Sequence, residues 1–324
     1  MNIQILGAGG WGTALAVVLA RQGVPVRLWA RSPERIEELR GARENRRYLP
    51  GVSIPEAVGF GLAPAADLAV VAVPTQHIRA ALGGLGLPRV PVVSAAKGLE
   101  MSTHLRPTEI LGRLFGTPTA ALSGPSHAEE VARGLPATLV AASADEALAK
   151  TVQKLFMGET LRIYTSTDVI GVETAGALKN IIAIAAGICD SLGLGDNAKA
   201  ALLTRGIVEI ARLGAKMGAQ RPTFFGVSGI GDLITTCYSL HGRNLRVGRE
   251  VGKGRALSEV LAEMSMVAEG VWTSKAALEL AREKGVEMPI TEAVVRILHQ
   301  GKAPREAVRE LMGRLPKSET EDWA

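Results

Sequence analysis

The chain has 324 residues, of which 47% are hydrophobic, 21% are charged and 4% are aromatic, and its formal net charge is +5. This length predicts two domains rather than one, and no apolar run reaches the roughly 18 residues that a membrane span needs. The 37 basic residues are interleaved with 32 acidic ones. With so few aromatic side chains for base stacking, a nucleic-acid-binding protein is disfavoured, and an anionic small-molecule substrate fits the charge at least as well.

The N-terminus and the cysteines exclude two further classes. Met1 leads directly into an apolar run and then glycines, without a basic segment or a cleavage signal, so we expect no secretory signal and a soluble, cytoplasmic protein. The two cysteines, Cys189 and Cys237, are too few and too far apart for a disulfide framework or a zinc site. We expect two free buried thiols and no metal site.

The first half of the chain alternates between short apolar runs and segments with helical spacing. This alternation is typical of βαβ units, and runs that are apolar on both faces indicate a mostly parallel sheet covered by helices. The predicted strands are Ile3–Leu6, Val26–Trp29, Leu68–Val73, Val90–Ala95, Thr119–Leu122, Ala137–Ala142 and Leu161–Tyr164. The predicted helices between them are Thr13–Arg21, Thr103–Leu114 and Ala128–Arg133.

From about Asp168 the strand signal disappears and helical patterns dominate, so we expect a Rossmann-type domain over residues 1–167 and an all-helical, substrate-binding domain over 168–324. The polar tail Lys317–Ala324 is expected to fray. The predicted helices of the second half are Val169–Ile188, Ala198–Met217, Ser258–Met264, Thr273–Lys284, Thr291–Leu298 and Pro304–Met312.

The first motif with chemical meaning follows the first predicted strand and reads Gly7-Ala8-Gly9-Gly10-Trp11-Gly12. In this position a G-x-G-x-x-G loop allows a tight turn, close approach of the backbone to a pyrophosphate, and close packing of a helix whose N-terminus faces the anion. We expect that helix to open at Thr13. The alternative is an ordinary glycine-rich turn between a strand and a helix.

The end of the second predicted strand bears on the choice of cofactor. An acidic residue normally stands there and binds the ribose 2′-hydroxyl of NAD, but this chain has Ala30 and Arg31. Because an arginine can pair with a 2′-phosphate, we expect NADPH to be accepted as well as NADH. The alternative is that Arg31 is a solvated surface residue.

A lysine stands in an unusual place in the second half. Lys179 lies in a predicted helix with almost no polar face, where Ala175, Gly176, Ile182 and Ala183 surround it at helical spacing. Burial penalises the ammonium and lowers its pKa toward the range of a general acid or base, so Lys179 is a candidate proton donor to a carbonyl oxygen. The alternatives are a lysine that reaches solvent or one that pairs with a carboxylate.

Other segments suggest ligand contacts. Gly226–Leu233 is rich in glycines, and His241–Asn244 adds Arg243 and Asn244, which offer donors suited to a phosphate. A helix turn with a surface basic pair is an equally good interpretation. Lys97 and Ser126 follow predicted strands, where ligands bind in open α/β sheets. His127 is given no catalytic role, and no G-x-S-x-G sequence indicates a hydrolase.

Taken together, the motifs resemble those of the bacterial-type NAD(P)-dependent glycerol-3-phosphate dehydrogenases, in the same order along nearly the whole chain. The matching segments are Gly7–Ala14, Asn45–Gly51, Ala96–Glu100, Leu122–Ala128, Glu173–Ile181, Gly229–Cys237, His241–Asn244, Val267–Gly270 and Met288–Ile290.

The resemblance implies the interconversion of dihydroxyacetone phosphate and glycerol 3-phosphate, with Lys179 as proton donor and acceptor and a role in supplying phospholipid synthesis. Implied substrate contacts are Lys97, Gly124, Ser126, Lys179, Asp232, Gly242, Arg243 and Asn244. Implied cofactor contacts are Gly7, Gly9, Gly10, Trp11, Gly12, Arg31, Tyr48, Lys97, Ala128, Arg243, Val267 and Glu269. Many relatives have serine where this chain has Gly242, so only a backbone contact is implied there.

Two other functions remain open from the sequence. A β-hydroxyacid dehydrogenase also combines a Rossmann domain with a lysine on a buried helix, but its lysine stands in K-x-x-x-N, whereas here Ala183 is four residues after Lys179. A non-catalytic NAD(P)-binding module would share the glycine loop but would need neither the buried lysine nor a phosphate clamp. A homodimer is expected from the frequency of two-fold oligomers alone.

Overall fold

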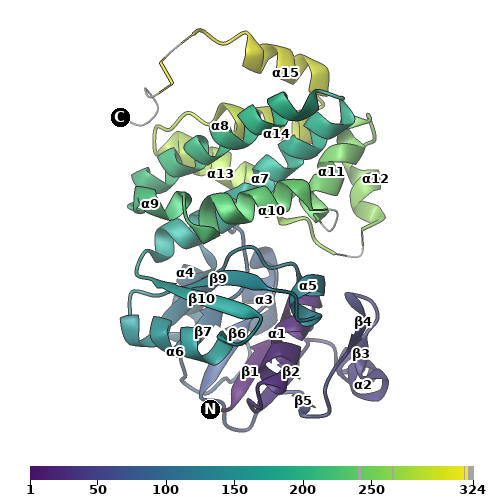
Figure 1. Cartoon of the computed structure of the whole chain (residues 1–324), viewed down its shortest axis with the longest axis vertical. Helices are drawn as coiled ribbons and strands as arrows, with labels where there is room; N and C mark the ends of the chain where they lie inside the picture. The colour runs from purple at the N-terminus through teal and green to yellow at the C-terminus, as the bar shows by residue number, and fades with distance from the viewer. Residues whose placement is uncertain (240–241, 265, 317, 320–324) are drawn as a thin grey trace. The chain divides into compact units, whose positions relative to one another are not determined.

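The computed structural model describes residues 1–239, 242–264, 266–316 and 318–319 (Figure 1). His241 and most of the tail Lys317–Ala324 lie outside the described residues. The chain divides into two compact units: one combines Met1–Lys97 with Arg106–Val169, and the other combines Gly98–Leu105 with Ile170–Ala324. We call them the Rossmann unit and the helical unit. The expected boundary at 167/168 lies close to the observed one, which follows Val169. The sequence did not predict that residues 98–105 belong to the helical unit.

The Rossmann unit is built on an eight-stranded sheet with the order β10-β9-β8-β7-β6-β1-β2-β5. All neighbours are parallel except β8 and β9, which confirms the mostly parallel sheet. The strands are β1 (Ile3–Leu6), β2 (Val26–Trp29), β5 (Val58–Phe60), β6 (Leu68–Val71), β7 (Val92–Ser94), β8 (Thr119–Ser123), β9 (Ala137–Ala142) and β10 (Leu161–Ser166).

Every residue of β1 and of β6 is buried, as expected for central strands with helices on both faces. Helix α1 packs against α5 and α6, and α3 packs against α4. The helices are α1 (Gly10–Arg21), α2 (Pro33–Ala42), α3 (Ile78–Leu82), α4 (Pro107–Phe115), α5 (Ala128–Ala132) and α6 (Glu146–Phe156), and Thr75–His77 forms a 3₁₀ turn.

Four differences from the expected elements have local causes. Helix α1 begins at Gly10 rather than Thr13, so three residues of the glycine loop form its first turn. The helix predicted from Thr103 begins instead at Pro107, because proline is favoured at the first helical position and restricts the residue before it. Helix α2 starts at the Ser32 cap, which accepts from the Arg35 amide, and α6 starts at the Asp145 cap. Neither helix was predicted, although both caps are visible in the sequence.

A small hairpin, β3 (Glu44–Asn45) and β4 (Leu49–Ser53), was also not predicted. Its strands are short and interrupted by charged and turn residues, so they lack the apolar alternation that marks a strand. The hairpin matters for the site because Asn45 donates to a carbonyl of the glycine loop.

The described part of the helical unit contains helices and no strand, in agreement with the prediction. Its elements are α7 (Val169–Ser191), α8 (Gly195–Lys216), α9 (Arg221–Phe224), a π-helical turn (Val227–Gly231), α10 (Asp232–Tyr238), α11 (Arg243–Gly252), α12 (Leu257–Ala262), α13 (Glu269–Glu283), α14 (Pro289–Gln300) and α15 (Pro304–Met312). Helices α9 to α11 were not predicted, because their apolar stretches are too short to show a helical period.

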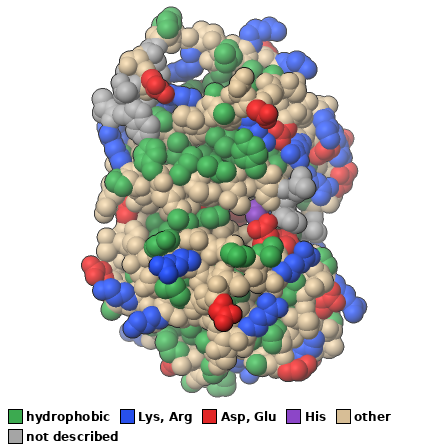
Figure 2. Space-filling model, viewed as in Figure 1, with side chains coloured by type: hydrophobic (Ala, Val, Ile, Leu, Met, Phe, Trp, Pro, Cys, Tyr) green, Lys and Arg blue, Asp and Glu red, His purple; other side chains and the backbone are tan. Residues whose placement is uncertain are grey.

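Helix α7 is the centre of the helical unit. It is the one helix in the described part of the chain long and apolar enough to cross a membrane, but 83% of its most apolar window is buried inside the protein. Buried residues from α7, α8, α10, α11, α13 and α14 form one core around it. Figure 2 shows apolar side chains gathered on one face of this unit. The exposed large hydrophobic residues of the unit include Phe225, Ile234 and Tyr238.

Candidate functional site

The glycine loop has the geometry that a pyrophosphate site needs. Gly7 has φ 116°, and a Cβ there would lie 2.7 Å from the Ala72 carbonyl oxygen, so only glycine fits. A Cβ at Gly12 would overlap the Gly7 carbonyl oxygen, whereas nothing lies within 4 Å of a Cβ at Gly9. Other backbone atoms therefore fill the space beside Gly7 and Gly12, whereas the space beside Gly9 is empty, and there the backbone can approach a ligand.

The first turn of α1 adds electrostatic attraction for an anion. The amides of Gly10, Trp11 and Gly12 precede the first intrahelical donor, Thr13, which donates to the Gly9 carbonyl at 3.0 Å. Unpaired amides and the helix dipole together favour negative charge at such an end. Because the helix starts at Gly10, the motif presents its own first-turn amides, rather than those of a helix that begins three residues later.

The β3–β4 hairpin holds this loop in place. Asn45 Nδ2 donates to the Ala8 carbonyl at 3.1 Å and to Thr13 Oγ1 at 2.7 Å, and Asn45 Oδ1 accepts from the Tyr48 amide at 3.2 Å. A Cβ at Gly10 would lie 2.6 Å from the Tyr48 carbonyl oxygen and 3.7 Å from Ala128 Cβ. The structure therefore brings Tyr48 and Ala128, two expected cofactor residues, against the glycine loop.

Arg31 follows β2 and precedes the Ser32 cap of α2. Its side chain is exposed, and no ion pair to it is seen among the described residues. This placement leaves the guanidinium available to a 2′-phosphate and is equally that of a solvated surface arginine. The sequence-based interpretation of Arg31 therefore stays a prediction.

Three expected substrate residues meet at the carboxyl ends of β7 and β8. Lys97 Nζ donates to the Gly124 carbonyl at 2.8 Å, and Ser126 Oγ donates to the same oxygen at 2.9 Å. Gly124 has φ 134°, a conformation that L side chains rarely adopt. The ends of adjacent parallel strands are where open α/β sheets bind ligands, so the three residues lie together at such an edge, and their contact with substrate stays a prediction.

The central group of the helical unit is Lys179 on α7. Its ammonium forms an ion pair with Asp232 Oδ1 and donates to Thr236 Oγ1 at 2.6 Å. Lys179 is 6% exposed and Asp232 is 1% exposed. The lysine is therefore buried, as predicted, but it is paired with a carboxylate, which was the alternative interpretation. Burial disfavours the ammonium, whereas the carboxylate stabilises it.

The glycines of Gly226–Leu233 explain how Asp232 reaches this position. Residues Val227–Gly231 form a π-helical turn that leads directly into α10. A Cβ at Gly229 would overlap the Phe224 carbonyl oxygen, so the turn depends on glycine there. Such turns occur often at functional sites. At Gly229 this close approach is between two segments of the protein itself, and the approach of the backbone to a ligand in this segment stays a prediction.

A second chain of polar contacts holds the start of α11 beside α7. Asn244 Nδ2 donates to Asn180 Oδ1 at 2.9 Å, and Asn244 Oδ1 accepts from the Gly270 amide at 3.0 Å. The exposed Arg243 donates through Nη1 to the Val267 carbonyl at 2.9 Å. The structure thus brings Arg243, Asn244 and Val267 together at one end of α11, close to Glu269, the first residue of α13.

Gly242, the residue before α11, stands in a tight space. A Cβ there would lie 3.0 Å from the Thr236 carbonyl oxygen and 3.1 Å from that of Ser239. A serine at this position would require these neighbours to shift by a few tenths of an ångström. In this chain glycine fits without that shift, and the implied contact is limited to the backbone.

Sequence reasoning missed the side chains that support the site. Thr236 contacts the Lys179 ammonium, Asn180 orients Asn244, and Asn45 fixes the glycine loop. Thr236 stands four residues after Asp232, and Asn180 stands directly after Lys179, so helical spacing and adjacency could have indicated them. For Asn45 the spacing gave no such signal, because Ala8 and Thr13, its partners at the glycine loop, lie more than 30 residues away.

These geometries define what each unit can do chemically. The Rossmann unit offers an open glycine turn with unpaired helix amides, which fits the pyrophosphate of a nicotinamide dinucleotide. The helical unit offers a buried ammonium held by a carboxylate and a hydroxyl, with an exposed arginine at the start of α11 on the same unit. An ammonium in such a setting can donate or accept a proton and stabilise a developing alkoxide.

Comparison with protein families agrees over almost the whole chain. A model described as NAD-dependent glycerol-3-phosphate dehydrogenase N-terminus matches residues 2–149, and the model of the C-terminus matches residues 168–309.

Individual relatives cover the chain more fully. A glycerol-3-phosphate dehydrogenase (NAD(P)+) of Chlorobium limicola is 50% identical, and the match covers 98% of this chain and 99% of the relative. That of Geobacillus kaustophilus is 51% identical, covering 99% of this chain and 97% of the relative. Both identities are far above the level at which only the fold is shared.

Solved structures give the same result. The glycerol-3-phosphate dehydrogenase of Coxiella burnetii has a TM-score of 0.92 at 37% identity and covers 97% of this chain and 99% of its own. The enzyme of Plasmodium falciparum has a TM-score of 0.87 at 25% identity and covers 98% of this chain and 97% of its own. The chain therefore belongs to the family of NAD(P)-dependent glycerol-3-phosphate dehydrogenases, oxidoreductases that act on a CH–OH group.

Proposed function

We propose that this enzyme interconverts dihydroxyacetone phosphate and glycerol 3-phosphate with Lys179 as its proton donor and acceptor. The observation that carries the proposal is the buried Lys179 ammonium, held by Asp232 and Thr236 on the helical unit. In the reducing direction the ketone carbon receives a hydride and its oxygen receives the Lys179 proton, which leaves an alcohol and a neutral amine. The bound dinucleotide supplies the hydride.

The contacts of Lys179 support this assignment. Asp232 and Thr236 accept from its ammonium, so they hold the nitrogen in one place. A fixed donor loses little entropy in the reaction and can meet the carbonyl oxygen in a near-attack geometry. The carboxylate also compensates the ammonium charge before substrate arrives, which reduces the cost of burying it.

We assign the substrate phosphate to Arg243, with Asn244 beside it. Arg243 is exposed at the first turn of α11, where a guanidinium and the N-terminal end of a helix both attract a phosphate. One Asn244 N–H already donates to Asn180, which leaves its second N–H for the ligand. Lys97, Gly124, Ser126 and the Gly242 backbone are further substrate contacts in this proposal, supported by the strand-end position of the first three.

The cofactor contacts are proposed on the same basis. The glycine loop, Trp11, Tyr48 and Ala128 are grouped around the start of α1, and Arg31 stands at the end of β2, where the adenosine ribose of a dinucleotide binds in this fold. Lys97, Arg243, Val267 and Glu269 complete the set implied by the family. Acceptance of NADPH favours the reducing direction, which would supply glycerol 3-phosphate for phospholipid synthesis. We further propose that the enzyme is cytoplasmic and forms a homodimer.

A spectrophotometric assay tests the function directly. NADPH or NADH oxidation is followed with dihydroxyacetone phosphate and, separately, with short 3-keto acids. We expect turnover with dihydroxyacetone phosphate alone. Turnover with the keto acids alone would establish a β-hydroxyacid dehydrogenase, and tight cofactor binding without turnover on any of them would establish a non-catalytic module.

A further inference from the structure

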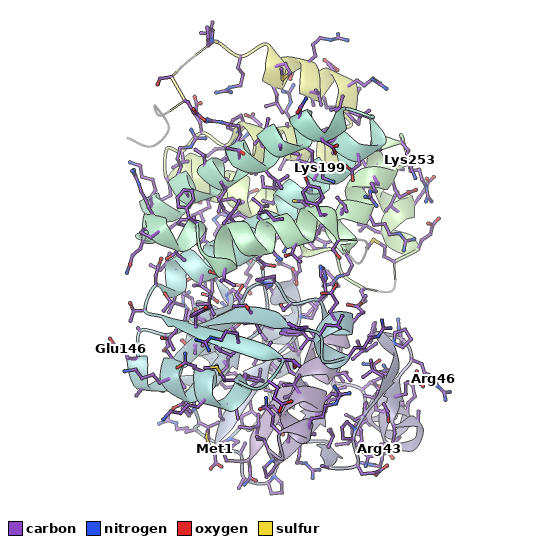
Figure 3. All side chains as sticks on the ribbon, in the orientation of Figure 1. Met1, Arg43, Arg46, Glu146, Lys199 and Lys253 are labelled. Carbon is purple, nitrogen blue, oxygen red and sulfur yellow. The ribbon has the colours of Figure 1, made fainter. Side chains whose placement is uncertain are left out.

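A second ion pair lies on α7, on the same face of the helix as Lys179, and joins a half-buried carboxylate to a buried lysine. Asp190 is eleven residues after Lys179, which is about three turns of an α-helix, so both side chains leave α7 in nearly the same direction. Asp190 Oδ1 accepts from Lys199 Nζ at 2.9 Å. Lys199 lies near the start of α8 and is labelled in the helical unit in Figure 3. At 7% exposure, its ammonium is nearly as buried as that of Lys179.

Asp190 binds a second cation through its other oxygen. Arg249 of α11 donates to Asp190 Oδ2 from Nη2 at 2.9 Å and from Nε at 3.1 Å. One carboxylate thus neutralises only one of two cations. The excess charge has a further partner in Tyr238, whose ring centroid lies 4.4 Å from Lys199 Nζ. A ring face at this distance attracts an ammonium, so Lys199 is held between the carboxylate and the ring.

These contacts connect the helices that carry the proposed catalytic and phosphate residues. Tyr238 is the last residue of α10, which begins with Asp232 and includes Thr236. Arg249 lies on α11, which begins with Arg243 and Asn244. Helix α11 is therefore bound to α7 at Asn244 and again at Arg249. Helix α10 is bound to α7 at Asp232 and Thr236, and its last residue is connected to α7 through Lys199 of α8.

Helices α7 and α11 approach each other closely beside the Asp190–Arg249 pair. A Cβ at Gly187 would overlap the Leu245 carbonyl oxygen, and one at Gly248 would overlap that of Ile184. The two backbones therefore touch directly at these glycines. The Asp190–Arg249 pair lies beside this close contact and, with the Asn180–Asn244 bond, fixes the register of the two helices.

We propose that Asp190 and Lys199 are positioning residues, which place α10 and α11 on α7 so that Asp232 and Thr236 hold the Lys179 ammonium. The inference rests on the proposed role of Lys179. Neither residue touches the reacting atoms. Their contribution is to the precision of the site, where a displacement of about 1 Å can reduce turnover about 100-fold.

Lys199→Met is the variant best suited to test the proposal. It leaves Asp190 paired with Arg249, so the half-buried carboxylate keeps a cation, whereas Asp190→Asn would leave the buried Lys199 ammonium without its carboxylate. The matched control is Lys216→Met, which removes an exposed lysine from the same helix. Lys199→Arg keeps a cation for the carboxylate and the ring and should restore part of what Lys199→Met loses.

Kinetics give the first measurement. For Lys199→Met we expect kcat to fall about 10- to 100-fold while KM for NADPH changes less than about twofold. Lys216→Met should match the wild type. A merely stabilising residue would lower the unfolding temperature without changing kcat of the folded enzyme. A folded Lys199→Met enzyme with wild-type kcat would therefore overturn the proposal.

The second measurement reports on α10 without using activity. Cys237 lies on α10, after Thr236 and before Tyr238 in the chain, and its side chain is buried. Burial raises the pKa of its thiol to about 12. The thiol should therefore react very slowly with a reagent such as dithiobis(nitrobenzoic acid). The chain has one other cysteine, Cys189, which Cys189→Ala removes. In this background Lys199→Met should accelerate labelling of Cys237 at least about tenfold, because α10 opens more often.

The kinetic and labelling results together decide whether Lys199 acts by positioning α10. A fall in kcat without faster labelling would refute positioning through α10. If Lys199→Met does not fold, Tyr238→Ala takes its place, since this half-exposed side chain contributes little to the core and should give the same two changes more weakly. Wild-type protein without activity on dihydroxyacetone phosphate would refute the proposed function, while labelling would still decide whether Lys199 holds α10.

Discussion

The two units build their functional groups in different ways. In the Rossmann unit the glycine loop, the start of α1 and the end of β2 lie within residues 7–31, so one local motif carries most of the proposed cofactor site. In the helical unit Lys179, Asp232, Arg243 and Asn244 come from three helices that hold one another through buried polar contacts. A substitution in the first should change one property, whereas a substitution in the second should disturb several.

The largest effect is expected for Lys179→Met. The substitution keeps the apolar stem and nearly the volume but removes the proton, and loss of general acid catalysis costs roughly 10²–10⁴-fold in turnover. NADPH affinity, measured by fluorescence titration, should be unchanged, because the glycine loop belongs to the other unit. Asp232 is then left buried without its partner, so circular dichroism and an unfolding curve must accompany the assay.

Lys179→Arg provides the control for that loss of charge. It keeps a cation for Asp232 but cannot act as a proton donor near neutral pH. Turnover should therefore remain low even if stability recovers. A folded Lys179→Met enzyme with turnover within a few-fold of wild type would make Lys179 a packing residue and remove the basis of the mechanism.

The next effect concerns substrate recognition by the helical unit. Arg243→Lys should raise KM for dihydroxyacetone phosphate about 10- to 100-fold, because an ammonium cannot reproduce the two parallel hydrogen bonds of a guanidinium to a phosphate. Dihydroxyacetone without the phosphate should be an equally poor substrate for both forms. Since Arg243 also donates to the Val267 carbonyl, NADPH affinity is measured in parallel. An unchanged KM for the phosphate ester would rule out the assignment.

A more selective effect is expected in the Rossmann unit. Arg31→Asp should raise KM for NADPH about tenfold more than KM for NADH, since an aspartate repels the 2′-phosphate and can accept from the 2′-hydroxyl. kcat should change little with either cofactor. Arg40→Asp on α2, which removes another exposed arginine of this unit, is the matched control. Equal changes in KM for both cofactors would show that Arg31 is only a surface residue.

The smallest expected effect is a difference between the two units in how their stability depends on pH. Burial raises the pKa of Glu209 on α8, even though its carboxylate accepts from the Ile290 and Thr291 amides at 2.8 Å each. A carboxyl whose pKa is higher in the folded state stabilises the fold fully below its unfolded value, near 4.5, and loses that contribution as pH rises through the folded value. In the Rossmann unit, hydrogen bonds lower the pKa values of the exposed Glu34 and the half-buried Glu44, so their contributions to stability change with pH in the opposite direction.

Glu209→Gln isolates this group, because it keeps an acceptor oxygen but cannot ionise. The free energy of unfolding of the wild type, relative to Glu209→Gln, should decrease as pH rises above about 4.5. Denaturant unfolding of both proteins at a series of pH values provides the measurement. A difference that is constant with pH, or that grows with it, would show that burial does not raise the pKa of Glu209.

The fold class, the cofactor loop and the resemblance to the family could all be predicted from local patterns in the sequence. Apolar runs separated by helical segments predict a parallel sheet because the signal is local and repeats, and the glycine loop is recognised because its three functions lie within six residues. Gly7, Gly12 and the buried Lys179 are where they were expected, and the structure gives the reason for each in a close contact or a buried position.

The partners of the charged residues in the helical unit could not be predicted from the sequence and are seen only in the folded structure. Whether Lys179 meets solvent, apolar groups or a carboxylate depends on Asp232, which stands 53 residues later and reaches it through a π-helical turn. The roles of Asn45, Thr236 and Asp190 depend likewise on partners distant in the chain. Burial can be inferred from the periodicity of one helix, but the partner of a buried charge is set by the packing of several helices, which no local pattern specifies.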